Sequence, residues 1–251
     1  IVHEEGIGFP ILLGNKEIIL ELKEEIGFDI DVPIFDPKTK ESEAKRLEYA
    51  NHFWETRKRK GVTLYEAEKW MRERNYFGLM MVNTGEADAM VTGHSRSYPS
   101  TIKPVMQLID KAPGVSKIAT TNMMMTARGP IFLSDTAINP NPSADDLARI
   151  ALMTAKTVRM FGMEPVIAMV SYSNFGSSNN EGPSKVSQAV AYLHENFPDL
   201  IVDGEIQTDF ALNSEMLKSK FPFSKLVNKK VNTLIFPNLD SANITYKLLK
   251  E

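Results

Sequence analysis

The sequence contains no cysteine among its 251 residues, which excludes disulfide bonds, thiolate catalysis and cysteine-ligated zinc. Its longest uncharged apolar runs, Leu79–Val82 and Val166–Val170, are far shorter than the ~20 residues that span a bilayer. Positive charge is not in excess, because 29 Lys and Arg residues are set against 32 Asp and Glu residues. The four histidines include no zinc-binding pair, and no signal peptide is visible. We therefore expect a cytoplasmic protein with no membrane, nucleic-acid or metal partner.

The remaining composition is that of a globular protein, with 43% apolar and 24% charged residues. At ~150 residues per domain, the length predicts one or two domains. The chain does not begin with Met, and residues 1–6 have the pattern of a last helical turn with Gly6 as its C-cap. This pattern leads us to expect a piece of a longer polypeptide.

Apolar spacing predicts an alternation of strands and helices along the whole chain. Thr63 and Glu66 form a capping-box pattern, and Ser143 and Asp146 open a second strongly amphipathic helix. Strands are predicted at 10–13, 30–35, 88–92, 117–126, 131–133, 165–170, 200–202 and 233–236. Helices are predicted at 15–27, 42–57, from 63 onward, at 97–110, 143–162, 183–196, 208–218 and 241–251.

This alternation favours a mostly parallel sheet with helices on its faces. The strands are too many for one sheet, so we expect two α/β units, residues 1–113 and 114–251, divided near 111–115. In open α/β sheets, ligands bind beyond the carboxyl ends of the strands. Four loops have such positions: 93–97, 134–142, 171–182 and 203–207.

The loop that begins at Ser171 is rich in hydroxyl groups and contains Gly176. Such a loop can offer backbone N–H groups and hydroxyls to an anion, or it can be an ordinary turn between a strand and a helix. The basic run Arg57–Lys60 either caps a helix or contacts a phosphate, and Arg96 and Lys103 flank the loop at Gly93. Residues 93–97 lack the closing glycine of a nucleophile elbow, which argues against a serine triad. Asp135, Asp203 and Glu205 follow strands as candidate acids, bases or helix caps.

Seven segments, in order over nearly the whole chain, resemble the phosphate acetyl/butyryl transferase family. Two of them are Arg57-Lys-Arg-Lys-Gly-Val-Thr63 and Val202-Asp-Gly-Glu-Ile-Gln207; the others are residues 76–82, 85–93, 101–107, 137–142 and 234–240. The resemblance implies two three-layer α/β/α units of the phosphotransacetylase and isocitrate-dehydrogenase type, with CoA in a cleft between them. It also implies that the family's first strand precedes Ile1. The return segment to the first unit and the catalytic Ser-Arg pair with its Asp would then follow Glu251.

Within the family, two segments look most like the C-terminal domain of multidomain NADP-dependent malic enzymes. Ser173-Asn-Phe-Gly-Ser177 stands where transferases usually have Ser-Thr-Lys-Gly-Ser, and residues 237–243 differ from Pro-Asp-Leu-Asn-Cys-Gly-Asn. Of the two family arginines near CoA and acyl phosphate, the first matches Arg57. The second falls at Lys103, which keeps the charge but loses the bidentate fork.

The resemblance thus implies a regulatory and oligomerisation domain that binds acetyl-CoA as an inhibitor and has no catalytic residue of its own. NADP and Mg²⁺ or Mn²⁺ would serve an N-terminal malic-enzyme domain of the same polypeptide, and this domain would dimerise. Two alternatives are an active phosphate acetyltransferase and a scaffold without a ligand. The expected acetyl-CoA or phosphate contacts are Arg57, Lys103, Ser95, Arg96, Ser173, Asn174, Gly176 and Ser177.

Overall fold

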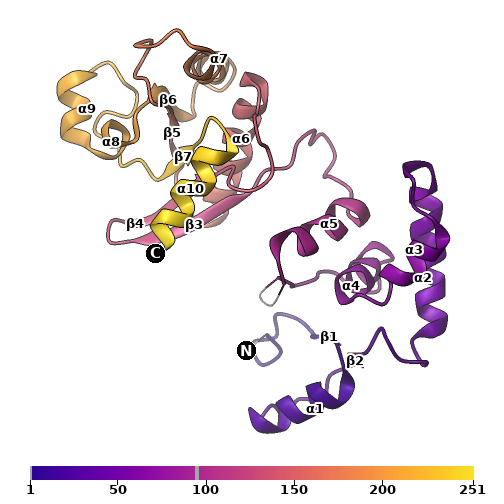
Figure 1. Cartoon of the computed structure of the whole chain (residues 1–251). Coiled ribbons are helices and arrows are strands. Elements are labelled where there is room, and N and C mark those ends of the chain that lie inside the picture. The colour runs from indigo at the N-terminus through magenta and orange to yellow at the C-terminus, as the bar shows by residue number, and fades with distance from the viewer. Residues whose placement is uncertain (1, 94–95) are drawn as a thin grey trace. The chain divides into compact units, whose positions relative to one another are not determined.

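The computed structural model of the chain describes residues 2–93 and 96–251, so Ser95 lies outside the described residues. The chain divides into two compact units, Ile1–Ala112 and Pro113–Glu251. Figure 1 draws the N-terminal unit in indigo to magenta and the C-terminal unit in pink to yellow. Residues 2–6 form turns, and Gly6 closes them with φ +67° as the sequence predicts for a C-cap: its N–H donates to the His3 carbonyl, and the Ile7 N–H donates to the Val2 carbonyl.

The N-terminal unit is built mainly of helices. Its strands β1 (Leu12–Leu13) and β2 (Ile34–Phe35) pair in parallel. The helices are α1 (Lys16–Glu25), α2 (Glu43–Arg57), the short 3₁₀ helix η1 (Lys58–Lys60), α3 (Leu64–Trp70), α4 (Arg74–Asn83) and α5 (Tyr98–Leu108).

Local sequence signals fix several of these helices. Asn15 caps α1 by accepting a hydrogen bond from the Ile18 N–H, and the predicted capping box of Thr63 and Glu66 opens α3. The core forms between α2, α3, α4 and α5 around fully buried aromatic and sulfur side chains, among them Tyr49, Phe53, Phe77 and Met80.

One prediction for the N-terminal unit is wrong, and one of its helices was not predicted. Residues 88–92 do not form a strand: Val91 is 99% exposed, while Met90 packs against the core of the unit without strand pairing. Instead, the Thr92 hydroxyl donates to Asn75 Oδ1 at 2.7 Å. The helix α4 was not predicted, because residues 76–81 are buried on all sides and therefore show no amphipathic period.

The C-terminal unit has a five-stranded sheet in the order β3-β4-β7-β5-β6. The strands predicted at 117–126 and 131–133 are present as β3 (Thr121–Thr126) and β4 (Gly129–Ser134), which pair antiparallel as a hairpin. The other pairs, among β4, β5 (Val166–Val170), β6 (Ile201–Ile206) and β7 (Thr233–Ile235), are parallel. Every residue of β5 is buried, as its continuous apolar run predicts for a strand covered on both faces.

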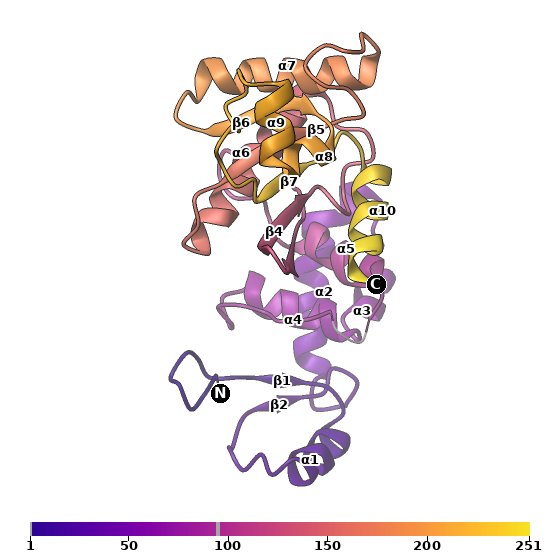
Figure 2. The same cartoon turned by 90° about the vertical axis from the view of Figure 1, so that its left-hand side faces the viewer.

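Helices cover both faces of this sheet, which makes the unit three-layered (Figure 2). The helices α6 (Ala144–Met160) and α7 (Glu181–Asn196) pack on the face that carries Ile167 and Met169. The opposite face, with Ala168 and Leu234, packs against α8 (Thr208–Leu212), α9 (Ser214–Lys220) and α10 (Leu239–Lys250). The single helix predicted at 208–218 is two helices, because the Asn213 side chain caps a new start by accepting from the Met216 N–H.

Candidate functional site

The loop after β5 is held to the end of β6 by the buried side chain of Glu205. Glu205 Oε1 accepts hydrogen bonds from the Ser173 hydroxyl at 3.0 Å and from the Gly176 N–H at 2.6 Å. The backbone carbonyl of Glu205 accepts from the Phe175 N–H at 2.8 Å. These contacts join the carboxyl ends of two neighbouring parallel strands, where ligands bind in sheets of this type.

A second set of hydrogen bonds, between Asn174 and Gln207, joins the same two strand ends. The Asn174 amide donates to Gln207 Oε1 at 2.7 Å, and the Gln207 N–H donates to Asn174 Oδ1 at 2.8 Å. Gln207 Nε2 also donates to the Tyr172 carbonyl at 2.8 Å. The loop that carries the predicted contacts Ser173, Asn174, Gly176 and Ser177 is therefore fixed by side chains from 205 and 207.

The backbone N–H groups of this loop are all used inside the protein. The Ser173 N–H donates to Ser171 Oγ, the Asn174 N–H to Ser177 Oγ, and the Ser177 N–H to the Asn174 carbonyl. Those of Phe175 and Gly176 donate to Glu205. Of the two alternatives open for this loop, these bonds favour a turn whose N–H groups at 173–177 are satisfied internally, and its residues stay predicted ligand contacts.

Phe175, the residue at which this loop departs from the family pattern, has an unusual backbone conformation and packs against two other aromatic rings. Its backbone is left-handed, with φ +45°, a conformation that non-glycine residues adopt rarely. Its ring packs against Phe221 and Phe223, with both centroid distances at 5.0 Å. The aromatic contacts stabilise the turn from inside the unit, a role that spacing in the sequence does not reveal because the partners lie more than 40 residues away.

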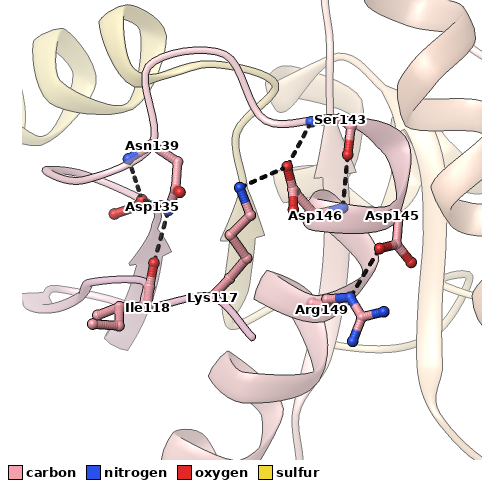
Figure 3. A network of polar contacts seen from close by, with 8 residues as sticks. All are labelled: Lys117, Ile118, Asp135, Asn139, Ser143, Asp145, Asp146 and Arg149. Atoms are coloured by element: carbon pink, nitrogen blue, oxygen red, sulfur yellow. Dashed lines mark hydrogen bonds and ion pairs between the residues drawn. The ribbon is translucent and has the colours of Figure 1, made fainter. Parts of the chain in front are cut away.

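Asp135 organises the loop after β4, and Figure 3 shows it bonded to Asn139 of that loop. Its carboxylate accepts from the N–H groups of Thr120, Ala137 and Asn139 at 2.8 to 3.1 Å, and also from the Asn139 side chain. Burial opposes the charge, but the hydrogen bonds from these residues outweigh it and hold the pKa of Asp135 below its usual value. A carboxylate so fully bonded acts as a structural cap.

Asp203 is also structural, whereas Glu205 keeps an unused acceptor. Asp203 Oδ2 accepts from the Ser224 hydroxyl and from the Lys225 N–H, both at 2.8 Å. Glu205 is 1% exposed, and its Oε2 atom has no hydrogen-bond partner among the described residues. Among the three acids proposed from the sequence, Glu205 is therefore the one with a carboxylate oxygen that is not used in these contacts.

Lys185 is a cation at this edge of the sheet that the sequence reasoning missed. It lies on α7, and its Nζ donates to Asn141 Oδ1 at 2.5 Å on the loop between β4 and α6. Burial lowers the pKa of Lys185. The signal that could have found it is its place in the second turn of the helix that follows the Ser171 loop.

The predicted cations of the N-terminal unit gather on and around α5. The Arg57 guanidinium donates to the carbonyls of Met106 and Gln107 at the C-terminal end of α5, which carries Lys103. Lys103 Nζ lies 5.4 Å from the centroid of the Trp70 ring. Arg96 pairs with Glu73 at 3.4 Å. Arg57 thus contacts the helix that carries Lys103, in the N-terminal unit, while Ser173–Ser177 belong to the C-terminal unit.

A cavity of about 1170 Å³ lies elsewhere in the C-terminal unit. Its wall includes Arg128 in the β3–β4 hairpin, Leu212 and Met216 of α8 and α9, and Leu249 of α10. None of the predicted contact residues that the structure describes lines it. Over residues 2–93 and 96–251, no group of three or more His, Asp or Glu side chains could hold a metal ion. No helix in those ranges is long and apolar enough to cross a membrane.

Comparison with known proteins agrees with the fold. A model of the family phosphate acetyl/butaryl transferase matches residues 1–251, so the chain belongs to this family. A crystal structure of a phosphotransacetylase from Streptococcus pyogenes superimposes with a TM-score of 0.85 at 38% identity, over 99% of this chain and 75% of that chain. The predicted α/β phosphotransacetylase fold is thus confirmed.

Two kinds of relatives resemble the chain at similar identity. It is 39% identical to a phosphate acetyltransferase of Thermoanaerobacterium thermosaccharolyticum, over 100% of this chain and 77% of the relative. It is 35% identical to an NADP-dependent malic enzyme of Salmonella typhimurium, over 98% of this chain and 32% of that protein. The expected specific closeness to malic enzymes is therefore not supported, since phosphate acetyltransferases match at least as well.

Proposed function

We propose that this chain is part of a phosphate acetyltransferase, which moves an acetyl group between acetyl phosphate and CoA. In this reaction the CoA sulfur forms a bond to the acetyl carbonyl carbon, and the bond from that carbon to the phosphate oxygen breaks. The phosphate leaves with the electron pair, and the thiol proton passes to solvent. The observation that supports the proposal most is the similarity, over the whole chain, to phosphate acetyltransferases at 37–39% identity and about three quarters of their length.

The cations of the N-terminal unit suit the anionic parts of these substrates. Arg57 offers a planar fork, and Lys103 is a point charge on the helix that Arg57 contacts. On this proposal, Arg57, Lys103 and Arg96 of the N-terminal unit bind phosphate groups of CoA or the acyl phosphate. The proposed ligand contacts of the C-terminal unit are Ser173, Asn174, Gly176 and Ser177. We place the protein in the cytoplasm, as a homo-oligomer.

A second candidate is a regulatory and oligomerisation domain of an NADP-dependent malic enzyme. It is favoured by Phe175, which replaces the usual lysine and whose ring is used in packing against Phe221 and Phe223. In that case acetyl-CoA is an inhibitor, and NADP and Mg²⁺ or Mn²⁺ act in another domain of the polypeptide.

One pair of assays separates the two candidates. The complete polypeptide that carries this sequence is given acetyl phosphate and CoA, and thioester formation is followed by ultraviolet absorbance. The same preparation is given malate, NADP and Mn²⁺, with and without acetyl-CoA. Thioester formation without malate-dependent NADP reduction supports the transferase, and the opposite result supports the malic-enzyme domain.

Variants of the arginine then test the site. Arg57→Ala is expected to raise the KM for CoA about tenfold or more and to reduce its dependence on salt, whereas Arg57→Lys recovers part of the affinity. Arg72→Ala, which removes an exposed arginine from the same unit, is the matched control. Equal effects of the Arg57 and Arg72 variants would contradict the placement of the site.

A further inference from the structure

The large cavity of the C-terminal unit begins at the edge of the sheet opposite to the Ser171 loop. Gly129, the first residue of β4, and Val231, which shortly precedes β7, both line it. The Ser171 loop instead follows the carboxyl end of β5, which pairs in parallel with β7. Because parallel strands end at the same edge of a sheet, the amino ends of β4 and β7 lie at the edge opposite to this loop.

From this edge the cavity continues along the face of the sheet that carries Leu234, and its wall there is apolar. Leu234 and Ala211 of α8 are buried, and Ile131 and Leu249 also line the wall. Figure 1 shows α10, the helix of Leu249, beside β3 and β4. The cavity of about 1170 Å³ exceeds the roughly 300–1,000 Å³ of pockets that hold small molecules, so it has room for an apolar ligand of that size.

Cations gather at the hairpin end of this cavity. Arg128, Lys229 and Lys230 line it, against one acid among the described lining residues, Asp209. A Cβ on Gly129 would lie 3.8 Å from Lys230 Nζ, which places this ammonium group at the hairpin turn, next to Arg128. Within the described ranges, none of the three cations forms an ion pair with an acid. This end of the cavity therefore carries an excess of positive charge that an anion can balance.

The Arg128 guanidinium is already held in place by the protein. It donates to the Leu212 carbonyl at 2.9 Å, at the end of α8. A guanidinium group has five N–H donors, so further donors remain for a carboxylate. Because the side chain is ordered before a ligand arrives, binding costs less side-chain entropy.

We propose that this cavity binds an amphipathic anion, with a carboxylate at Arg128 and Lys230 and an apolar chain along Leu234 and Leu249. The cations select the charge of the head group, and the apolar wall selects the chain. No aromatic side chain is among the described lining residues, so the wall offers no ring on which a nucleotide base could stack. The described contacts proposed for the transferase do not line this cavity, so the proposed site is independent of that function.

Calorimetry of the complete polypeptide with decanoate, kept below its micelle concentration, tests the proposal. Decylammonium, which has a chain of the same length and the opposite charge, is the matched ligand. Decanoate is expected to bind about tenfold more tightly or better, and added salt should reduce this difference. Hexanoate, which has the same head group on a shorter chain, should bind about tenfold more weakly than decanoate or worse, since each buried methylene group contributes to affinity.

Two pairs of variants locate the site. Leu249→Glu brings a negative charge to the wall and should lower the affinity for decanoate about tenfold, whereas Leu248→Glu, on the same helix but outside the wall, should keep the native affinity. Lys230→Ala should lower the affinity about threefold, and Lys220→Ala, which removes an exposed cation outside the wall, is its control. A thermal midpoint of each variant shows whether it is folded.

The outcomes separate this proposal from the proposed function. Equal affinity for decanoate and decylammonium, or decanoate binding that Leu249→Glu and Lys230→Ala leave unchanged, would overturn it. A folded complete polypeptide that does not bind decanoate would also overturn it, and would indicate that another part of the polypeptide or a second copy fills the cavity. Thioester formation should be the same in all four variants, and its absence from the native protein would contradict the transferase proposal alone.

Discussion

The Arg57 guanidinium donates to the backbone carbonyl of Gln107, 50 residues further along the chain. This contact ties the end of α2 to the last turn of α5, where a cation is favoured by the unpaired carbonyls and the helix dipole. A residue expected to bind substrate thus also holds the helix that carries Lys103.

Removing Arg57 should therefore lower stability as well as affinity. We expect Arg57→Ala to reduce the unfolding free energy of the N-terminal unit by about 1 kcal/mol, since the bonds it makes are partly exposed. Both tryptophans, Trp54 and Trp70, lie in this unit, so urea unfolding followed by tryptophan fluorescence reports on it alone. An unchanged midpoint would show that the contact with α5 contributes nothing.

Gly204 should not tolerate a side chain. A Cβ at this position would lie 2.4 Å from the Met169 carbonyl oxygen, and φ is +147°. Because a backbone atom of the adjacent strand β5 cannot move aside, Gly204→Ala should destabilise the C-terminal unit by about 3 kcal/mol or more.

Gly182 is the matched control in the same unit. It lies in α7 with ordinary φ, and nothing would contact its Cβ, so Gly182→Ala should be neutral or stabilising by up to about 1 kcal/mol. Thermal unfolding followed by circular dichroism compares the two, and equal midpoints would contradict the assignment.

Asp135 should make the C-terminal unit sensitive to acid. The pKa of its carboxyl is lower in the folded protein than in the unfolded chain, so folding favours the charged form. The stability from this shift is present above the unfolded pKa of about 3.8 and is lost as the pH falls through the folded pKa.

Asp135→Asn removes this dependence. Its stability at neutral pH should fall by about 2 kcal/mol, because the amide cannot accept all the hydrogen bonds, and the loss of stability below pH ~4 should become shallower. Urea midpoints at about pH 3 to 7 measure how stability depends on pH, and Asp199→Asn, at an exposed position, is the control. An acid profile identical to that of the native protein would show that Asp135 does not hold this charge.

Phe175 should matter more to stability than its exposed neighbour Phe223. The centroid of the Phe175 ring lies 5.0 Å from those of two other aromatic rings, and the side chain packs against the core. Phe223, in contrast, is 69% exposed. Phe175→Ala is expected to lower the unfolding free energy by about 2 kcal/mol, and Phe223→Ala by less than half of that. Similar losses in both would mean that the ring of Phe175 is not the packed one.

Much of the C-terminal unit could be predicted because its signals are local or periodic. The apolar run of β5 is continuous in the sequence, and the cap that starts α6 involves only Ser143 and Asp146, three residues apart. Residues 88–92 failed for the opposite reason: their alternation suits a strand, but a strand also needs a partner, which the sequence does not name.

The sequence predicted candidate loops for the site, but not the contacts within them. The rule that ligands bind at the carboxyl ends of strands selected four loops, among them the Ser171 loop. It could not show that Glu205 would accept from the Gly176 N–H, or that Asn174 would pair with Gln207. Those roles depend on hydrogen bonds between residues about 30 positions apart, and such pairs leave no periodic trace.

The central claim is tested most directly by incubating the complete polypeptide with acetyl phosphate and CoA and following the thioester absorbance. We predict steady formation of thioester, reversed by added phosphate and weakened in Arg57→Ala but not in Arg72→Ala. No thioester from a folded polypeptide that binds acetyl-CoA would contradict the transferase proposal and leave the malic-enzyme domain in its place.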